Sequence, residues 1–366
     1  MGLNCGIVGL PNVGKSTIFS ALTSAKAEAA NYPFCTIEPN VGIVSVPDER
    51  LNKIVSFIPT AKVIPAVTEF VDIAGLVAGA SKGEGLGNKF LANIREVGVI
   101  AHVVRCFENP DIIHVNNKVD PASDIETIKI ELALADLETV QRRYEKQSKL
   151  AKVAHDPKDV AAVPVLEKLI AALSEGKSAR SVISTDDEEA IVKDLCLITM
   201  KPVIYVCNID EESIGNDNEH VKVVKEIAAK ENASVVTICG KTEAEIAAME
   251  SEEDRREFLE ALGLEDSGMN QLIKKAYETL GLRTFFTAGS DEDRAWTFKA
   301  GYKAPQAAGV IHTDFEKGFI RAEVYSCNDL FEYGSEAKVK EAGKLRIEGK
   351  DYVVQDGDIM HFRFNN

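Results

Sequence analysis

The residues best suited to chemistry stand near the start of the chain. The segment from Gly9 to Ser16 reads GLPNVGKS, follows a short apolar run and precedes an expected helix. In such a loop, glycines let backbone N–H groups converge on phosphate oxygens, and the helix N-terminus adds a favourable dipole. Lys15 would reach the β- and γ-phosphates, and the Ser16 hydroxyl would bind Mg²⁺. The pattern therefore predicts a nucleoside triphosphate site.

Further residues that serve such a loop follow in order along the chain. Thr36 could complete the Mg²⁺ shell with a second hydroxyl, although an ordinary loop threonine is the alternative. An apolar strand then ends in Asp72, whose carboxylate would hold Mg²⁺ through water. Gly75 could offer its backbone N–H to the γ-phosphate. We therefore expect Mg²⁺ at Ser16, Thr36 and Asp72, with Gly75 acting beside Lys15 on the transferred phosphate.

Two segments compete as the loop that reads the base. Residues 117–120 read NKVD and match the guanine-reading motif, but only one clear strand, 98–106, separates them from Asp72. We interpret this match as fortuitous. A better strand, 202–207, ends in NIDE at 208–211, and another, 234–238, leads into a CGK segment. The predicted base-contacting residues are Asn208, Ile209, Glu211, Cys239 and Gly240.

The sequence NIDE changes the expected base. An aspartate at its last position would accept hydrogen bonds from N1–H and the 2-amino group of guanine, whereas adenine presents an acceptor at N1. Glu211 is one methylene longer and can turn away, and Ile209 replaces the lysine that packs on the base. Asn208 and nearby backbone groups could read the 6-amino group. We predict ATP in preference to GTP; the alternative is a degenerate GTPase that still binds guanine.

Hydrolysis is expected to depend on an unusual group. Leu76 stands where related enzymes carry the glutamine that orients the attacking water, and leucine cannot do so. Hydrolysis is then very slow, or another side chain supplies the contact. His114 is the catalytic candidate because histidine titrates near neutral pH, although a lone loop histidine is often merely solvated. Asn12 adds an expectation of K⁺, since an asparagine at that position helps to bind K⁺ in several P-loop GTPases.

Several segments together resemble the YchF/Obg-like ATPase family, which belongs to the Obg-related P-loop translation-factor GTPases. They are GLPNVGKST, NYPFCTIEPN, DIAGLV, GASKGEGLGN and the NxxE loop. The resemblance covers the full length. It implies slow, Mg²⁺-dependent ATP hydrolysis, ribosome association and a regulatory role. It places phosphate contacts on Asn12, Val13, Gly14, Lys15, Ser16 and Thr17.

The predicted function is therefore an Mg²⁺-dependent hydrolase that prefers ATP over GTP and acts as a ribosome-associated regulatory switch. The alternative is a nucleotide-gated RNA- or ribosome-binding GTPase-like protein with little intrinsic hydrolysis, and Leu76 is its main support. A metabolic small-molecule kinase is disfavoured, because no acceptor-substrate lid is evident.

The elements that would position these residues form a P-loop α/β domain with an insertion. Apolar residues at helical spacing predict a long helix over about 124–152, a second helix starting near 166 and a third through 191–198. We expect the nucleotide domain at 1–123 and 200–280, with a helical hairpin or coiled coil at 124–199. One helix face is basic and could contact RNA phosphates, or simply be solvated. Its residues are Arg142, Arg143, Lys146, Lys149 and Lys152.

The pattern changes to short strands and turns after residue 280. Strands are expected at 284–288, 295–298, 320–325, 344–347, 352–354 and 359–363. This part, 281–366, resembles a TGS domain, a β-grasp (α+β) module. Lys299, Lys303 and Arg321 beside Trp296 and Tyr302 could form an RNA-facing edge, or the aromatic rings could belong to the core.

Composition limits the remaining possibilities. The net charge of −16 excludes broad nucleic-acid binding, so we expect no specific DNA contact and only a local basic patch for RNA. The 7 cysteines show no CxxC spacing and fit a reducing compartment. Without an apolar run long enough to span a bilayer, we expect no membrane contact and a cytoplasmic, monomeric protein. Whether Cys35 is redox-active is not fixed by the sequence.

Overall fold

The computed structural model describes residues 3–24, 40–73, 86–115, 118–153 and 156–365. These residues divide into two compact units. The first holds 3–24, 40–42, 69–73 and the described part of 86–272, and the second holds 43–68 and 273–365.

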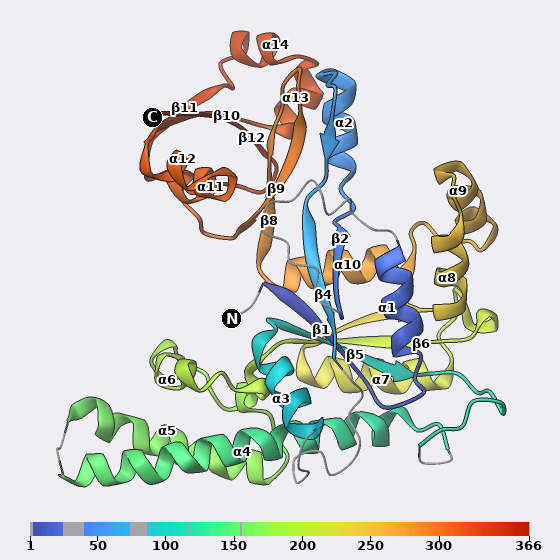
Figure 1. The fold of residues 1–366 in the computed structure, drawn as a ribbon, viewed down its shortest axis with the longest axis vertical. Coiled ribbons are helices and arrows are strands. Elements are labelled where there is room, and N and C mark those ends of the chain that lie inside the picture. The colour runs from blue at the N-terminus through green and yellow to red at the C-terminus, as the bar shows by residue number, and fades with distance from the viewer. Residues whose placement is uncertain (1–2, 25–39, 74–85, 116–117, 154–155, 366) are drawn as a thin grey trace. The chain divides into compact units, whose positions relative to one another are not determined.

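The first unit is built on a parallel sheet (Figure 1). The strand order is β2-β4-β1-β5-β6-β7, and the five strands from β4 to β7 in this order run parallel to one another. These strands are β1 (Asn4–Val8), β2 (Val41–Ser45), β4 (Val67–Asp72), β5 (Val99–Arg105), β6 (Val203–Asn208) and β7 (Ser234–Ile238). Every residue of β5 is buried, as expected for a parallel strand covered on both faces. The predicted P-loop α/β fold is confirmed, and its carboxyl strand ends meet at one edge.

Helices connect and cover these strands. They are α1 (Lys15–Ser24), α3 (Leu86–Glu96), α7 (Glu219–Glu231), α8 (Gly240–Ala248), α9 (Glu252–Ala261) and α10 (Gly268–Thr279). Helix α7 buries Val221 and Val224 against Tyr205 and Cys207 of β6. Packing of this kind fixes the ends of β6 and β7, from which the predicted base loops leave.

The inserted segment forms a long helical hairpin. Helices α4 (Pro121–Val153) and α5 (Pro157–Ser174) lie side by side in Figure 1. Val140 of α4 is buried with Leu166, Leu169 and Leu173 of α5. The hairpin follows the predicted apolar spacing. Among the described residues, none of the helices is both long and apolar enough to cross a bilayer.

The third predicted helix, through 191–198, was wrong in extent. Helix α6 (Asp186–Val192) is short, and two 3₁₀ turns (Lys193–Leu195 and Ile198–Met200) replace its continuation. Cys196 between them has a left-handed φ of 47°. The buried carboxylate of Asp136 accepts hydrogen bonds from the N–H groups of Ile198 and Thr199, at 3.0 and 2.7 Å. These bonds satisfy backbone groups that a continuous helix would have used internally.

The second unit contains a six-stranded sheet of order β11-β10-β12-β8-β9-β3. Its strands are β3 (Val63–Ile64), β8 (Leu282–Thr287), β9 (Asp293–Lys299), β10 (Phe319–Ser326), β11 (Arg346–Glu348) and β12 (Asp358–Phe364). Its helices include α2 (Glu49–Phe57), α11 (Ala304–Ile311), α12 (Thr313–Lys317), α13 (Cys327–Tyr333) and α14 (Glu336–Glu341). One face packs around Phe285, Phe298, Val324 and Met360. The expected strand at 352–354 is only an isolated bridge between Val353 and Lys303, because Gly357 (φ 86°) turns the chain directly afterwards.

Residues 43–68 group with this second unit, although the sequence analysis had placed them in the nucleotide domain. Strand β3 pairs with β9, and the ring of Phe57 stacks on that of Phe331 at 6.0 Å. The Arg50 guanidinium bonds Asp356 at 2.7 Å. These contacts join segments up to 306 residues apart in sequence, which no local pattern can indicate.

Candidate nucleotide site

The phosphate loop lies between β1 and α1, as the sequence predicted. Asn12 and Gly14 have positive φ, 61° and 91°, so the loop needs residues that tolerate the left-handed region. A Cβ on Gly14 would lie 2.1 Å from the Asn208 side-chain nitrogen. A glycine is therefore required here for both backbone conformation and close approach.

Asn208 joins the two halves of the site. It ends β6, is buried, and its side-chain N–H₂ donates to the carbonyl oxygen of Val13 at 2.9 Å. Its side-chain oxygen accepts from the N–H of Gly240 at 3.0 Å. One amide thus connects the phosphate loop to the start of α8. Val13 is itself buried and contributes through its backbone.

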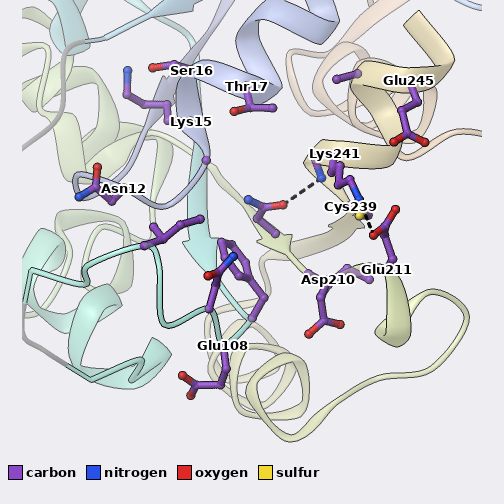
Figure 2. Close-up of a pocket in the computed structure, with 18 of the residues that line it drawn as sticks. Asn12, Lys15, Ser16, Thr17, Glu108, Asp210, Glu211, Cys239, Lys241 and Glu245 are labelled. Atoms are coloured by element: carbon purple, nitrogen blue, oxygen red, sulfur yellow. Dashed lines mark hydrogen bonds and ion pairs between the residues drawn. The ribbon is translucent and has the colours of Figure 1, made fainter.

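A cavity of about 1150 Å³ lies at this edge of the sheet. Figure 2 shows its lining, which comes from the phosphate loop, residues 107–112, the end of β6 and the start of α8. The structure brings together most of the predicted binding residues there, namely Asn12, Gly14, Lys15, Ser16, Thr17, Asn208, Ile209, Glu211, Cys239 and Gly240. Its position at the carboxyl ends of parallel strands is where α/β proteins commonly bind ligands.

The phosphate end of the cavity combines a cation with oxygen donors. The Lys15 ammonium forms an ion pair with the carboxylate of Asp72, and both side chains are largely buried. Among the described residues, no group of three or more His, Cys, Asp or Glu side chains could hold a metal ion. The Ser16 hydroxyl and the Asp72 carboxylate are nevertheless hard oxygen donors of the kind that Mg²⁺ uses beside phosphate. Thr36, Gly75, Leu76 and Cys35 lie outside the described residues.

The base end of the cavity is apolar on one side and charged on the other. Ile209 is buried and packs with the β6–α7 core. The Glu211 carboxylate lies 2.8 Å from the Lys241 ammonium, and both are exposed (Figure 2). The Thr242 hydroxyl donates to the Cys239 sulfur at 3.2 Å. Glu211 is therefore engaged by α8.

The competing segment 117–120 has a different role. Asp120 accepts from the N–H of Ser123 at 3.2 Å and precedes Pro121, the first residue of α4, so it caps that helix. Lys118 is exposed, 4.0 Å from Asp120. Neither residue lines the cavity, and Asn117 lies outside the described residues.

His114 is placed beside the cavity but does not line it. Its Nε2 lies 2.9 Å from the Asp124 carboxylate, and both side chains are almost fully buried. Burial raises the pKa of Asp124, and the hydrogen bond to His114 opposes that rise. The next residue back, Ile113, accepts from the Asn12 side chain at 3.1 Å. The phosphate loop and the His114 loop are thus directly connected.

Arg105 organises this loop and was missed by the sequence analysis. It ends the buried strand β5 and is 1% exposed. Its guanidinium donates to the carbonyl oxygens of Phe107, Asn109 and Ile112 at 3.1, 3.2 and 2.9 Å. A lone arginine at the end of a buried strand was the available signal, since such a cation needs several acceptors.

The predicted basic face of α4 is only partly free for a partner. Arg142 pairs with Glu138, and Arg143 pairs with Asp194 at 2.9 Å. The other members are exposed and, within the described residues, form no ion pair; they are Lys146, Lys149 and Lys152. In the second unit, Trp296 and Tyr302 pack against the core, as in the second alternative considered above.

Comparison with known proteins agrees with this architecture. Residues 4–161 match a family model described as a 50S ribosome-binding GTPase, and residues 282–365 match the YchF GTPase C-terminal family, described as a protein of unknown function. Proteins named ribosome-binding ATPase YchF from Bacillus subtilis (strain 168) and Escherichia coli O157:H7 are 57% and 54% identical, each with 100% of both chains covered. The solved structure of the Schizosaccharomyces pombe YchF GTPase has a TM-score of 0.89 and 38% identity, covering 99% of this chain and 98% of that one. The chain belongs to the YchF family.

Proposed function

We propose that this protein is an Mg²⁺-dependent P-loop hydrolase that prefers ATP over GTP and acts as a ribosome-binding regulatory switch. The observation that carries the proposal is the cavity in which Lys15, Ser16 and Thr17 meet the end of β6 and the start of α8. The names of the full-length relatives, ribosome-binding ATPases, support the same activity and partner.

The phosphate end would act by charge and position. Lys15 would leave Asp72 to contact β- and γ-phosphate oxygens, and Ser16, Thr36 and, through water, Asp72 would hold Mg²⁺. Bound Mg²⁺ would neutralise charge on the phosphate oxygens during transfer. Gly75 would donate its N–H to the γ-phosphate. The Asn12 side-chain nitrogen donates to the carbonyl oxygen of Ile113, and the Asn12 side-chain oxygen would serve as a ligand for K⁺.

The base end would favour adenine because no carboxylate is held at the position of N1. Lys241 engages Glu211, and Ile209 and Cys239 provide an apolar contact surface for a purine. Asn208 would hold the loops in register, and backbone groups around it would read the 6-amino group.

Hydrolysis would require His114 to exchange Asp124 for the attacking water. The buried His114–Asp124 pair supports a resting state with low turnover, which also agrees with the alternative of a nucleotide-gated protein that hardly hydrolyses. Replacement of His114 by alanine decides between them. Loss of turnover with intact ATP binding supports the enzyme, and unchanged turnover contradicts the role given to His114.

The remaining parts would carry the nucleotide state to the ribosome. We assign the nucleotide domain to 1–123 and 200–280, apart from residues 43–68, which group with the second unit, the helical arm to 124–199 and a TGS β-grasp domain to 281–366. The protein would act as a cytoplasmic monomer without specific DNA contact. The basic face of α4, with Arg142 and Arg143 at its start, would approach ribosomal RNA. Lys146, Lys149 and Lys152 are exposed there and would contact phosphates.

Equilibrium binding of Mg²⁺·ATP and Mg²⁺·GTP tests the specificity. Wild type should prefer ATP, and the double variant Ile209→Lys/Glu211→Asp should shift the affinity ratio towards GTP by about tenfold. The double variant Val223→Lys/Glu226→Asp introduces the same two residues, lysine and aspartate, on an exposed face of α7 and should leave the affinity ratio unchanged. Equal or GTP-favouring binding by wild type would overturn the adenine assignment.

Cosedimentation with ribosomes tests the partner surface. Replacing Lys146, Lys149 and Lys152 by glutamine should weaken binding by about tenfold and reduce its salt dependence. The matched control replaces the three exposed lysines Lys222, Lys225 and Lys230 of α7. Equal losses in the two triple variants would contradict a specific role for α4.

A further inference from the structure

A second cavity, of about 340 Å³, lies in the first unit between α4 and the sheet. Its floor consists of two cross-strand pairs, Ile100 with Val203 and His102 with Tyr205, which are in register on β5 and β6. Residues two apart on a strand project to the same face, so all four side chains point to one side. Helix α4 closes the cavity with Ile128 and Leu132, and Figure 1 shows α4 running below these strands. The volume is in the range of small-molecule sites.

His102 lines this cavity and has unused hydrogen-bonding capacity. It is 4% exposed, and within the described residues its imidazole forms no hydrogen bond, only a ring contact with Tyr205 at 5.6 Å. Burial, with a smaller contribution from Lys129, lowers the pKa of His102 to about 3. At neutral pH the ring is therefore uncharged and offers one donor and one acceptor. A buried polar group without a partner is uncommon, and a ligand would supply the partner.

Positive charge is in excess around the same cavity. Lys129 and Arg180 both pair with Glu231, the latter at 3.3 Å, and Glu231 also accepts from the Tyr205 hydroxyl at 2.9 Å. Lys201 is 1% exposed, and its ammonium donates to the backbone carbonyl oxygens of Arg95 and Val97.

Four cations and three carboxylates line the cavity: Lys129, Lys177, Arg180 and Lys201 against Glu126, Glu175 and Glu231. Of these, Glu126, Glu175 and Lys177 are exposed and screened by water. The less exposed lining residues are the three cations Lys129, Arg180 and Lys201, with Glu231 as their carboxylate. Buried charge that lacks a counter-charge is costly, so an anion placed here would be stabilised.

We propose that this cavity binds a small organic anion with a planar apolar body. The body would lie between the β5–β6 floor and Ile128 of α4, and the anionic group would face Lys129 and Arg180. His102 would hydrogen-bond to a polar atom of the ligand. A bound ligand would tie the base of the α4–α5 hairpin to the sheet that carries the nucleotide site. This inference is independent of the function proposed above.

A matched pair of probes tests the proposal on the full-length protein. Indole-3-carboxylate and indole-3-carboxamide have nearly the same shape, but only the first is an anion. Saturation-transfer NMR is recorded with saturating Mg²⁺·ATP, so that neither probe can occupy the nucleotide cavity. The carboxylate should bind at one site with a Kd below about 1 mM, and the carboxamide at least about tenfold more weakly.

Variants of α4 locate the binding. Ile128→Trp fills the cavity and should abolish carboxylate binding, whereas Ile130→Trp makes the same change at an exposed position two residues away and should leave it intact. If circular dichroism shows that Ile128→Trp does not fold, Lys129→Gln replaces it, with Lys149→Gln as its exposed control. Lys129→Gln should weaken binding at least about threefold. Equal affinity for the two probes, no saturable binding, or binding that survives these cavity variants would overturn the proposal.

Discussion

Residues 117–120 and 208–211 both begin with asparagine and end with an acidic residue, but residues 118–120 and 208–211 lie in different structural surroundings. Asn208 ends a fully paired parallel strand, is buried, and bonds both the phosphate loop and the start of α8. Asp120 precedes α4 and caps it, and Lys118 points into solvent. The first segment closely matches the guanine motif, but its described residues, 118–120, do not line the cavity, whereas the second segment matches it poorly and lines the cavity.

The difference teaches that a base-reading motif is defined by the strand that it leaves. A side chain can bridge two loops only where the carboxyl ends of neighbouring parallel strands meet. The side-chain amide of Asn208 supplies both a donor and an acceptor there, so it satisfies a carbonyl and an N–H at once. Asp120, which caps α4, bonds instead to the N–H of Ser123.

The largest expected effect comes from removing the amide that joins the two halves of the site. Asn208→Ala leaves the carbonyl of Val13 and the N–H of Gly240 without partners, which should destabilise the fold by about 3 kcal/mol. ATP affinity should fall at least about tenfold, since the phosphate loop loses its support. Denaturant unfolding and calorimetric titration measure the two effects. Asn117→Ala is the matched control, and a comparable loss of affinity there would reverse the assignment of the two segments.

Helix α8, whose start borders the base end of the cavity, also carries a carboxyl group that titrates unusually. Glu243 of α8 is buried and accepts from the N–H of Gly268 at 2.6 Å. Burial raises its pKa from 4.5 to about 7, against the lowering effect of hydrogen bonds from Gly268 and Met269. The folded protein thus binds this proton more tightly than the unfolded chain does. Stability from this group is present below pH 4.5 and is lost as pH rises through about 7.

Glu243→Gln should therefore remove a pH dependence. Between pH 4.5 and 7 the wild-type free energy of unfolding should decrease by about 2 kcal/mol more than that of the variant. Urea unfolding across this range measures the difference. Glu245→Gln, on the same helix and exposed, should behave as wild type. Parallel curves for wild type and Glu243→Gln would mean that folding leaves the pKa of Glu243 unchanged, which would contradict this prediction.

Local patterns accounted for most of the fold. Apolar runs located β1, β4, β5, β6 and β7, apolar segments with turn residues located β8 to β12, and helical spacing located α4 and the second half of α5, because each of these elements buries its own apolar face. Strands β2 and β3 and the first half of α5 were not predicted. The C-terminal end of the third helix was not predictable, because the carboxylate of Asp136, some 60 residues earlier, accepts hydrogen bonds from the N–H groups of Ile198 and Thr199. The domain prediction for residues 43–68 was wrong for the same reason, because β3 is two residues long and its partner β9 is far along the chain.

In the candidate site too, residues set by a local pattern could be predicted and residues set by distant contacts could not. The phosphate loop could be predicted because its glycines and Lys15 are dictated by the ligand over a few consecutive residues. Arg105 could not, because its role depends on the path of a loop without regular structure. The pairing of His114 with Asp124 depends on how α4 packs beside that loop, which the sequence leaves open.

A moderate effect is expected at the capping residue of the other segment. Asp120→Ala removes the side-chain acceptor for the N–H of Ser123 and should destabilise the fold by about 1 kcal/mol. Affinities for ATP and GTP should stay within about twofold of wild type. Thermal unfolding and nucleotide titration measure both. Asp156→Ala removes the corresponding cap of α5, where Asp156 accepts from Lys158 at 2.8 Å, and should cost a similar amount. A selective loss of GTP binding in Asp120→Ala would show that 117–120 contacts a base after all.

The smallest effect is expected at the ion pair that engages Glu211. Lys241→Ala frees the Glu211 carboxylate, which lies at the edge of the cavity and could then turn towards a bound base. Because an exposed pair holds its partners weakly, the ATP-to-GTP affinity ratio should decrease by no more than about threefold, and the decrease should vanish at high salt. Lys222→Ala breaks an exposed pair of similar length on α7, at 2.7 Å from Glu219, and should leave the ratio unchanged. If Lys241→Ala leaves the ratio unchanged at low salt as well, the chain geometry after Asn208 keeps Glu211 from the base without help from Lys241. Specificity would then be fixed by the path of β6 into its loop, the same feature that separates 208–211 from 117–120.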